Sequence, residues 1–278
     1  MFNHGSLPRI EKALRDLESK GLAGKTLRNY AEGISAFCDW CVDRGYLADD
    51  PLRALAPFDT TPQTRRRAMN PDEIRALLAV SPPDRCLLYE TALFSGLRTN
   101  ELRSLTIDDL DIEGCGLHLD AKWTKNRKPG FQPLPRKLVE QLQDFAATGD
   151  AQRIYKANFS RGKTQRPLPK RPLLYVPSQT NRCLIIDLKV AEIPTDTPKG
   201  KLDFHALRTT YINLIMDTGL TLKDAQALAR HATPELTLMF MVGRGKIECQ
   251  RPLNKLPKKC FGRRTVLYPC NGWPSVPK

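Results

Sequence analysis

The chain has 278 residues, with 44 Lys and Arg against 30 Asp and Glu, so its formal net charge is +14. This length is sufficient for a large core, most simply in two domains. The positive excess indicates a polyanionic partner, and nucleic acid is the commonest one; a basic surface that serves solubility alone is the alternative. The sequence has no run of about 18 apolar residues to span a membrane. The N-terminus lacks the apolar segment of a signal peptide, so we expect a cytoplasmic protein.

Eight cysteines are scattered along the chain, and Cys38 and Cys41 form a C-x-x-C pair. This spacing occurs in redox and zinc sites. The pair stands in a segment where apolar residues, including Leu27, Tyr30 and Phe37, recur at helical spacing. We therefore expect buried thiols on an apolar helix face, with no metal and no cofactor.

Residues 1–56 predict a small helical domain that binds DNA. The apolar residues keep helical spacing from Ile10 to the stop at Gly21, and again over residues 26–44. Residues 57–68 combine two prolines with the arginine triplet Arg65, Arg66 and Arg67. This composition predicts a linker whose arginines neutralise phosphates along a duplex; a solvated charge run is the alternative.

A second domain is predicted over residues 69–245, and its first helix begins after Asn70 with a capping box completed by Glu73. Helical patterns cover residues 71–80, 84–95, 99–106, 136–147, 203–218 and 221–230. Three alternating segments between residues 110 and 135 predict antiparallel strands, with Lys125 in the turn between the last two. The expected fold class is mainly α with a small antiparallel β-hairpin sheet (α+β).

Two further segments are strongly basic. Residues 152–172 hold seven basic residues and no acidic one. We expect Arg161 and Lys163 in this insertion to contact DNA, and the alternative is a surface loop without a partner. Residues 246–278 form a basic tail that we expect to order only on a partner.

Four short motifs carry residues suited to holding a phosphodiester. They are SGLRTNEL, TKNRK, DFHALR and ARHATPELT, which contain Arg98, Lys125, His205, Arg208 and His231. Arg98 follows an apolar stretch and needs an anionic partner, which is Glu101, another buried carboxylate or a ligand phosphate. His205 and Arg208 are three residues apart, a spacing that places both on one face of a helix.

Taken singly, each of these residues is more often structural or exposed than functional. Together, two guanidinium forks match phosphate oxygens and can neutralise a pentavalent phosphorane. No Asp/Glu cluster with two-metal spacing stands near the motifs. The pattern therefore predicts metal-free transesterification.

The four motifs, in this order and spacing, resemble those of the tyrosine recombinase (phage integrase) family. The resemblance implies a two-domain clamp around double-stranded DNA, self-association on DNA, and strand breakage and rejoining without a cofactor. It also implies roles for the motif residues. Arg98 and Arg208 would clamp the scissile phosphate, Lys125 would protonate the leaving 5′-oxygen, His205 would assist proton transfer at the nucleophile, and His231 would bond a non-bridging oxygen.

The sequence departs from the family where the nucleophilic tyrosine is expected. Phe240 and Met241 occupy those positions, and neither has an ionisable oxygen. Tyr268 is the one tyrosine after His231. A decayed integrase, a chain altered to trap a complex, and an unusual nucleophile from the tail are three explanations, and the first two are favoured over Tyr268.

Two other functions compete with recombination. One is a DNA-binding module on the same fold, without catalysis, which the missing tyrosine favours. The other is a helical interaction protein whose basic surface meets RNA or acidic proteins. That last function leaves the four ordered motifs unexplained.

Overall fold

The computed structural model divides the chain into two compact units, Met1–Arg65 and Arg66–Lys278. It describes residues 6–62, 65–124, 127–159, 170–218, 220–231, 233–234 and 236–237. The predicted tail, the nucleophile positions Phe240 and Met241, and Lys125, Arg161 and Lys163 lie outside the described residues. Within the described part, no helix has the length and apolar character needed to cross a bilayer.

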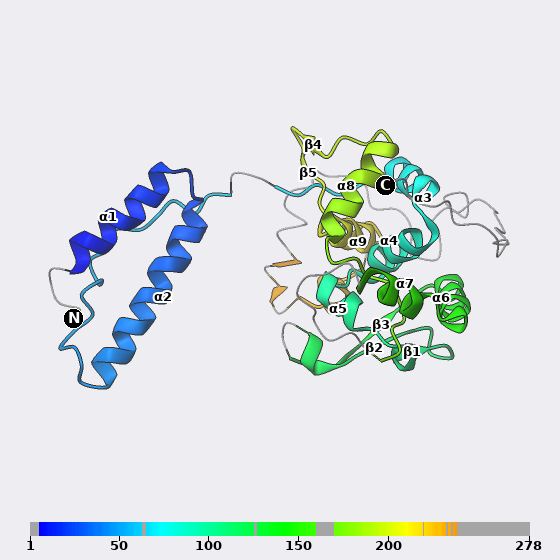
Figure 1. Cartoon of the computed structure of the whole chain (residues 1–278), viewed down its shortest axis with the longest axis horizontal. Coiled ribbons are helices and arrows are strands. Elements are labelled where there is room, and N and C mark those ends of the chain that lie inside the picture. The colour runs from blue at the N-terminus through cyan, green and yellow to red at the C-terminus, as the bar shows by residue number, and fades with distance from the viewer. Residues whose placement is uncertain are drawn as a thin grey trace. The chain divides into compact units, whose positions relative to one another are not determined.

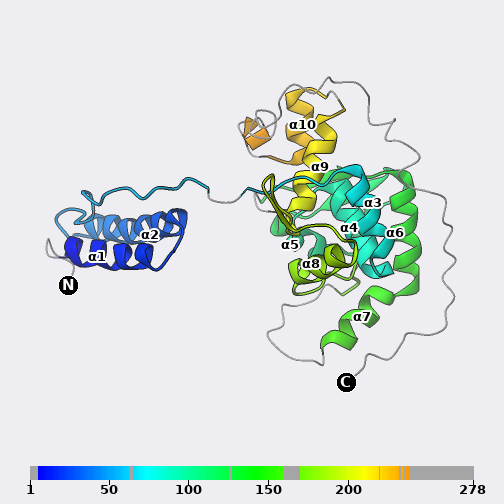
Figure 2. The same ribbon diagram turned by 90° about the horizontal axis from the view of Figure 1, so that it is seen from above.

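The first unit consists of two helices that lie side by side, α1 (Ser6–Ser19) and α2 (Gly24–Asp43) (Figures 1 and 2). Leu14 of α1, Leu27 of α2 and Phe58 form its buried core. Phe58 belongs to the segment predicted as linker, so this unit uses more of the chain than residues 1–56. Two paired helices enclose little apolar core by themselves, and Phe58 completes the one they form.

The buried face of α2 differs in part from the predicted one. Cys38 and Cys41 are buried free thiols, as expected. Tyr30 and Phe37 are about half exposed, at 49% each, although their spacing had placed them on the apolar face. Phe37 stacks instead on the exposed Trp40, with ring centroids 6.1 Å apart. Helical spacing predicted the helix correctly but not which of its two apolar stripes is covered.

The second unit is mainly helical. Its helices are α3 (Pro71–Val80), α4 (Pro83–Ser95), α5 (Thr99–Ser104), α6 (Arg136–Thr148), α7 (Asp150–Phe159), α8 (Thr180–Val190), α9 (Ala206–Met216) and α10 (Leu222–Ala229), with 3-10 turns η1 (Ile107–Asp109) and η2 (Ala121–Trp123). Its strands are β1 (Leu110–Asp111), β2 (Gly116–Leu119), β3 (Gly130–Pro133), β4 (Asp196–Thr197) and β5 (Gly200–Lys201). The fold class is mainly α with small antiparallel sheets, which confirms the prediction.

The predicted three-stranded sheet is present, with strand order β1-β2-β3 and antiparallel pairing throughout. Leu110 pairs with Leu117, and Leu117 pairs with Gln132. The predicted capping box at the start of α3 is also present, because the Asn70 side chain accepts from the Glu73 N–H at 2.9 Å. The sequence reasoning missed α8 and the short β4-β5 hairpin.

The start of α9 differs from the prediction in a way that matters for the site. The helix begins at Ala206, so His205 is its N-cap residue and not part of a helix face shared with Arg208. Asp203 Oδ1 accepts from the Ala206 N–H at 2.9 Å and holds the turn before the helix, which begins three residues after the predicted start at residue 203. His205 and Arg208 are still joined locally, because the Arg208 N–H donates to the His205 carbonyl at 3.1 Å.

The arginine triplet is not a free linker. The backbone of Arg66 pairs with that of Lys201 in an isolated parallel β-bridge, and the Arg67 N–H donates to the Lys201 carbonyl at 3.1 Å. The Arg67 guanidinium is bound at both ends by the Glu73 carboxylate, at 2.8 Å each. Only Arg65 precedes the second unit. The division between the units therefore falls inside the predicted linker, because Arg66 and Arg67 pair with Lys201 of β5.

Buried ionic bonds fix α8 against α4. The Asp187 carboxylate of α8 accepts from Arg85 Nε at 2.7 Å, from Arg85 Nη2 at 2.8 Å and from the Tyr89 hydroxyl at 2.7 Å. Burial and the neighbouring Asp187 raise the pKa of Tyr89. A buried carboxylate is stable here because three donors replace its water shell.

Helix α4 packs directly against α9 and ends at Gly96, which has φ +61 and so adopts the left-handed conformation. A Cβ at Gly96 would lie 2.2 Å from Cδ1 of the Tyr211 ring on α9. Glycine is therefore required at this position both for its backbone conformation and for the close approach of the two helices.

We expect Gly96→Ala to lower the free energy of unfolding by about 2–4 kcal/mol, because the new methyl group meets a buried ring at a left-handed position. Gly149→Ala is the matched control. Gly149 also ends a helix with φ +67 but has nothing within 4 Å of a Cβ. Its substitution should cost roughly 1 kcal/mol. Equal losses in urea unfolding of the two variants would contradict the role of Tyr211.

Candidate functional site

The end of α4 and the start of α5 place Arg98 at the site. Arg98 precedes α5 as its N-cap residue, and its backbone N–H donates to Glu101 Oε2 at 2.8 Å. Its guanidinium Nη1 lies 3.2 Å from Glu101 Oε1. The Arg98 side chain is 30% exposed, whereas that of Glu101 is 2% exposed. Of the three anionic partners considered from sequence, the structure supplies Glu101, and the Arg98 guanidinium stays accessible.

Arg208 comes from the first turn of α9 and is almost fully buried, at 4% exposure. Its Nη1 donates to the Gly96 carbonyl and its Nη2 to the Ala229 carbonyl. These carbonyls lie at the C-terminal ends of α4 and α10, where unpaired carbonyl groups and the helix dipoles favour a cation. Burial, followed by the charge of Arg98, lowers the pKa of Arg208 to about 10, so it stays protonated at neutral pH.

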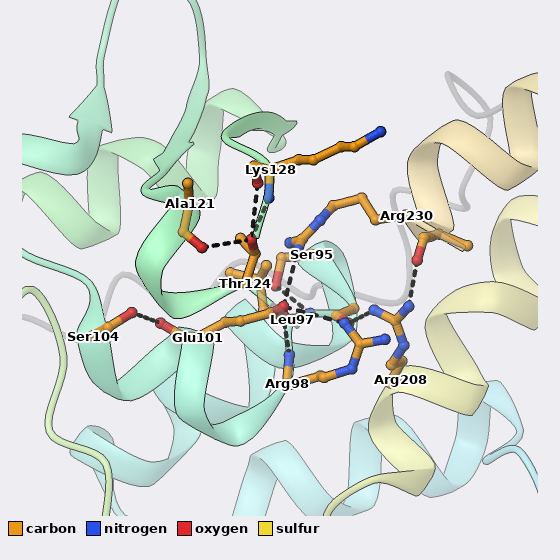
Figure 3. Close-up of polar contacts among 12 residues, drawn as sticks. Ser95, Leu97, Arg98, Glu101, Ser104, Ala121, Thr124, Lys128, Arg208 and Arg230 are labelled. Carbon is orange, nitrogen blue, oxygen red and sulfur yellow. Dashed lines mark hydrogen bonds and ion pairs between the residues drawn. The ribbon is translucent and has the colours of Figure 1, made fainter. Parts of the chain in front are cut away.

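Figure 3 shows the guanidinium groups of Arg98 and Arg208 side by side, with Arg230 reaching across from the end of α10 to Glu101. Arg230 Nη2 donates to Glu101 Oε1 at 2.7 Å. The sequence reasoning did not identify Arg230. One feature of the sequence could have indicated it: an arginine directly follows Ala229, the last residue of α10, at a position where glycine usually ends a helix.

His231 follows Arg230 and enters the same site. Its Nδ1 lies 3.0 Å from the Thr237 hydroxyl, and its backbone N–H donates to the Gln226 carbonyl at 3.1 Å. Burial lowers the pKa of His231 to about 4, and the positive charges of Arg208 and Arg98 contribute to the shift. The imidazole is therefore neutral at physiological pH and can act as a hydrogen-bond donor without adding charge.

His205 lies at the edge of the cluster. Burial is the main cause that lowers its pKa, and the charges of Arg66 and Arg208 lower it further, while Asp203 opposes them. Arg66 Nε donates to Asp203 Oδ2 at 2.6 Å, so an arginine from the predicted linker stands beside this histidine. His205 is thus a neutral imidazole close to two guanidinium groups.

The β2-β3 turn, which carries Lys125, is anchored from beneath by a buried threonine. The Thr124 hydroxyl accepts from the Lys128 N–H at 3.1 Å and lies 2.9 Å from the Lys128 carbonyl. Figure 3 shows the Lys128 side chain extending from this turn on the side of the guanidinium cluster. Lys125 itself lies outside the described residues, so its place at the site stays a prediction.

Four of the five sequence-predicted site residues, Arg98, His205, Arg208 and His231, are brought together by α4, α5, α9 and α10. Besides burial, the charge of Arg98 contributes to lowering the pKa values of both histidines and of Arg208. Among the described residues, no group of three His, Cys, Asp or Glu side chains is placed to hold a metal ion. The site is a cationic cluster with neutral imidazoles, which suits an oxyanion such as a phosphodiester.

The sequence predicted that all three linker arginines neutralise phosphates, and the structure does not favour this for Arg67. Its side chain is 10% exposed and the Glu73 carboxylate bonds both ends of its fork, so its charge is already neutralised, whereas Arg208 bonds to uncharged carbonyls. Arg66 is 51% exposed although it pairs with Asp203, and Arg65 is exposed. The structure leaves these two accessible to a polyanion.

No family model matches the chain. Tyrosine recombinase XerC of Neisseria meningitidis serogroup C is 25% identical over 236 residues, which are 82% of this chain and 72% of the relative. Tyrosine recombinase XerC of Chlamydia trachomatis serovar D is 24% identical over 230 residues, or 78% of this chain and 66% of the relative.

Solved structures with a similar fold include a lambda integrase dimer bound to a COC′ core site, with a TM-score of 0.63 at 17% identity. That match covers 88% of this chain and 67% of that chain. The Tn1549 transposon integrase in complex with transposon right end DNA gives a TM-score of 0.56 at 16% identity, covering 87% of this chain and 81% of that chain. The fold is that of the integrases, and the predicted resemblance of this chain to the tyrosine recombinase family is confirmed.

We expect the His231 imidazole to stay neutral until the pH falls well below 6.5. An unfolded histidine binds a proton near pH 6.5, whereas folded His231 does so near 4. Its neutral form therefore favours the folded state fully above pH 6.5, and this contribution is lost as the pH falls toward 4. Titration of the imidazole resonances by NMR measures the pKa directly, since the chain has four histidines.

Arg98→Gln tests the electrostatic contribution to this shift, because it removes one of the two charges that lower the pKa. The pKa of His231 should rise but remain below 6.5, since burial is the larger cause. A value near 6.5 in the unaltered chain, or no change in the variant, would contradict this account of the site.

Proposed function

We propose that this protein binds double-stranded DNA and holds one phosphodiester between Arg98 and Arg208, as a site-specific recombinase of the tyrosine recombinase type does. The observation that carries the proposal is the convergence of two guanidinium groups and a neutral histidine from α5, α9 and the end of α10. A fork that keeps its charge while buried, as at Arg208, is suited to an anion whose charge grows during the reaction.

In this proposal each side chain has one task. Arg98 and Arg208 bind the two non-bridging oxygens, and His231 donates a hydrogen bond to one of them. His205 assists proton transfer at the attacking oxygen, and Lys125 of the β2-β3 turn protonates the leaving 5′-oxygen. The covalent step needs an attacking oxygen, which a tyrosine at position 240 or 241 would supply. Its hydroxyl oxygen would bond to phosphorus and lose its proton with the help of His205, while the bond from phosphorus to the 5′-oxygen breaks and Lys125 protonates that oxygen. Attack of the 5′-hydroxyl on the resulting 3′-phosphotyrosyl ester would release the tyrosine and rejoin the strands.

The relatives and the structural neighbours support DNA as the partner. The neighbours include an integrase dimer on a core site and a transposon integrase on transposon end DNA. We propose that the two units of this chain close around a duplex as a clamp, and that protomers associate on it. Arg65, Arg66, Arg161 and Lys163 would add contacts to backbone phosphates, which position the protein without reading sequence.

A second candidate function is DNA binding without strand cleavage. Phe240 and Met241 stand where the nucleophilic tyrosine is expected, and neither side chain has an oxygen that can attack phosphorus. A chain with the phosphate clamp but no nucleophile would occupy recombination sites and compete with an active recombinase.

Binding should depend steeply on salt, because each neutralised phosphate releases counterions. Arg98→Gln should weaken binding of a duplex about tenfold and lower the salt slope by about one, since it removes one phosphate contact. The control is Arg75→Gln, an exposed arginine on α3 that pairs with Asp72. It should change the affinity less than about twofold. Fluorescence anisotropy at several salt concentrations measures both, and salt-independent or absent binding of the unaltered chain would refute DNA binding.

A suicide-substrate assay separates cleavage from binding alone. The unaltered chain should bind duplex DNA but form no covalent 3′-phosphotyrosyl adduct. Phe240→Tyr or Met241→Tyr should produce the adduct at whichever position meets the phosphate, because the other groups are retained. Tyr268→Phe is the control for the tail. An adduct from the unaltered chain that disappears in Tyr268→Phe would show that the nucleophile lies in the tail.

A further inference from the structure

Arg230 ends α10 in an unusual backbone conformation for its residue type. It has φ 51 and ψ 45, the left-handed region, and its N–H donates to the Ala227 carbonyl at 3.0 Å. Glycine adopts this conformation freely, whereas another residue costs roughly 1 kcal/mol there. The ion pair that the Arg230 side chain makes with Glu101 is a contact that glycine at this position would lack.

The side chain of Arg230 is directed at the buried carboxylate of Glu101. Its Nη2 donates to Oε1 at 2.7 Å, a shorter contact than the 3.2 Å between Arg98 Nη1 and the same oxygen. Arg230 is also more buried than Arg98, at 13% against 30% side-chain exposure. Glu101 is thus bound more closely by Arg230 than by Arg98, and the weaker contact leaves the Arg98 guanidinium available.

Arg230 changes the net charge around Glu101. Among the described residues, Arg98, Arg208 and Arg230 surround one carboxylate, Glu101, and Arg208 is bonded to uncharged carbonyls. Three positive charges and one negative charge leave an excess of two. Without Arg230 the excess would be one. A phosphodiester carries a single negative charge, whereas a pentavalent phosphorane carries more, so the larger excess favours the transition state.

We propose that Arg230 is a positioning residue that neutralises Glu101, so that Arg98 and Arg208 both present uncompensated charge to the phosphate. This inference rests on the phosphate site proposed above. Arg230 acts through Glu101 and not by direct contact, because its remaining terminal nitrogen, Nη1, is covered from solvent and has no partner in the described structure. A bound oxyanion would be attracted by the net positive charge of the Arg98, Arg208, Arg230 and Glu101 cluster, and it would not contact Arg230 Nη1.

A charge-balance experiment tests the inference in the full chain. Sulfate is titrated into the unaltered protein and into Arg230→Gly, Glu101→Gln and the double variant, with the His231 imidazole resonance as the report of the site. Glycine suits the left-handed backbone, so Arg230→Gly keeps the helix end intact. Arg230→Gly should weaken sulfate binding roughly tenfold, because Glu101 then competes for Arg98. The double variant restores the excess of two charges and should bind sulfate within about threefold of the unaltered chain.

Arg230→Lys is the conservative variant and should retain sulfate affinity within about threefold, since it keeps the charge. The proposal is overturned if Arg230→Gly binds sulfate with the affinity of the unaltered chain, because Arg230 would then serve only to end α10. It is also overturned if the double variant binds as weakly as Arg230→Gly, which would mean direct contact, or if Arg230→Lys loses as much affinity as Arg230→Gly. Absence of sulfate binding in the unaltered chain would overturn the phosphate site itself, and this inference with it.

Discussion

The arrangement of the second unit depends on the burial of Arg208. The N–H groups of an almost fully buried guanidinium need hydrogen-bond acceptors inside the protein. Arg208 has them in the backbone carbonyls at the C-terminal ends of two helices, α4 and α10. These bonds set the positions of the segments that carry Arg98 and His231. The same guanidinium therefore joins three helices and supplies charge to the site.

Packing between α4 and α9 makes this arrangement possible. Gly96 ends α4 without a side chain, so the ring of Tyr211 on α9 can approach the turn closely. Tyr211 is held in turn by the β3 strand, because Gln132 Nε2 lies 3.0 Å from its hydroxyl. Helix packing and the hairpin sheet thus support one another around the turn that precedes Arg98.

Electrostatics then determines what the site can hold. Glu101 is the carboxylate that bonds two of the three guanidinium groups, and its burial prevents water from screening these contacts. Burial, with a further contribution from the positive charges, lowers the pKa values of His231 and His205, so the histidines offer hydrogen bonds and proton transfer without further charge. A cluster of this kind is stable with an anion and repels a metal cation. The chemistry that fits is phosphoryl transfer in which arginines neutralise the developing charge.

Local sequence patterns predicted most of the helices and strands and most of the site residues. The capping box at Asn70, the hairpin strands and the helices from α3 to α6 follow from short-range patterns that need no distant partner. The motifs around Arg98, Arg208 and His231 could be identified because their residue types are uncommon in apolar surroundings. The resemblance to tyrosine recombinases was likewise available from the order of the motifs.

Only the tertiary structure decided which partners these residues have. Tyr30 and Phe37 have helical spacing, yet they are half exposed because the other stripe of α2 faces the core. Arg67 lies in a segment whose composition predicts a linker, but it is bound to Glu73 because Arg66 and Arg67 pair with Lys201 of β5. Arg230 reaches Glu101 across 129 positions of sequence, a contact that no local pattern encodes. Periodicity and motifs report what a residue is suited to do, whereas burial and charge balance depend on segments that meet only in the folded chain.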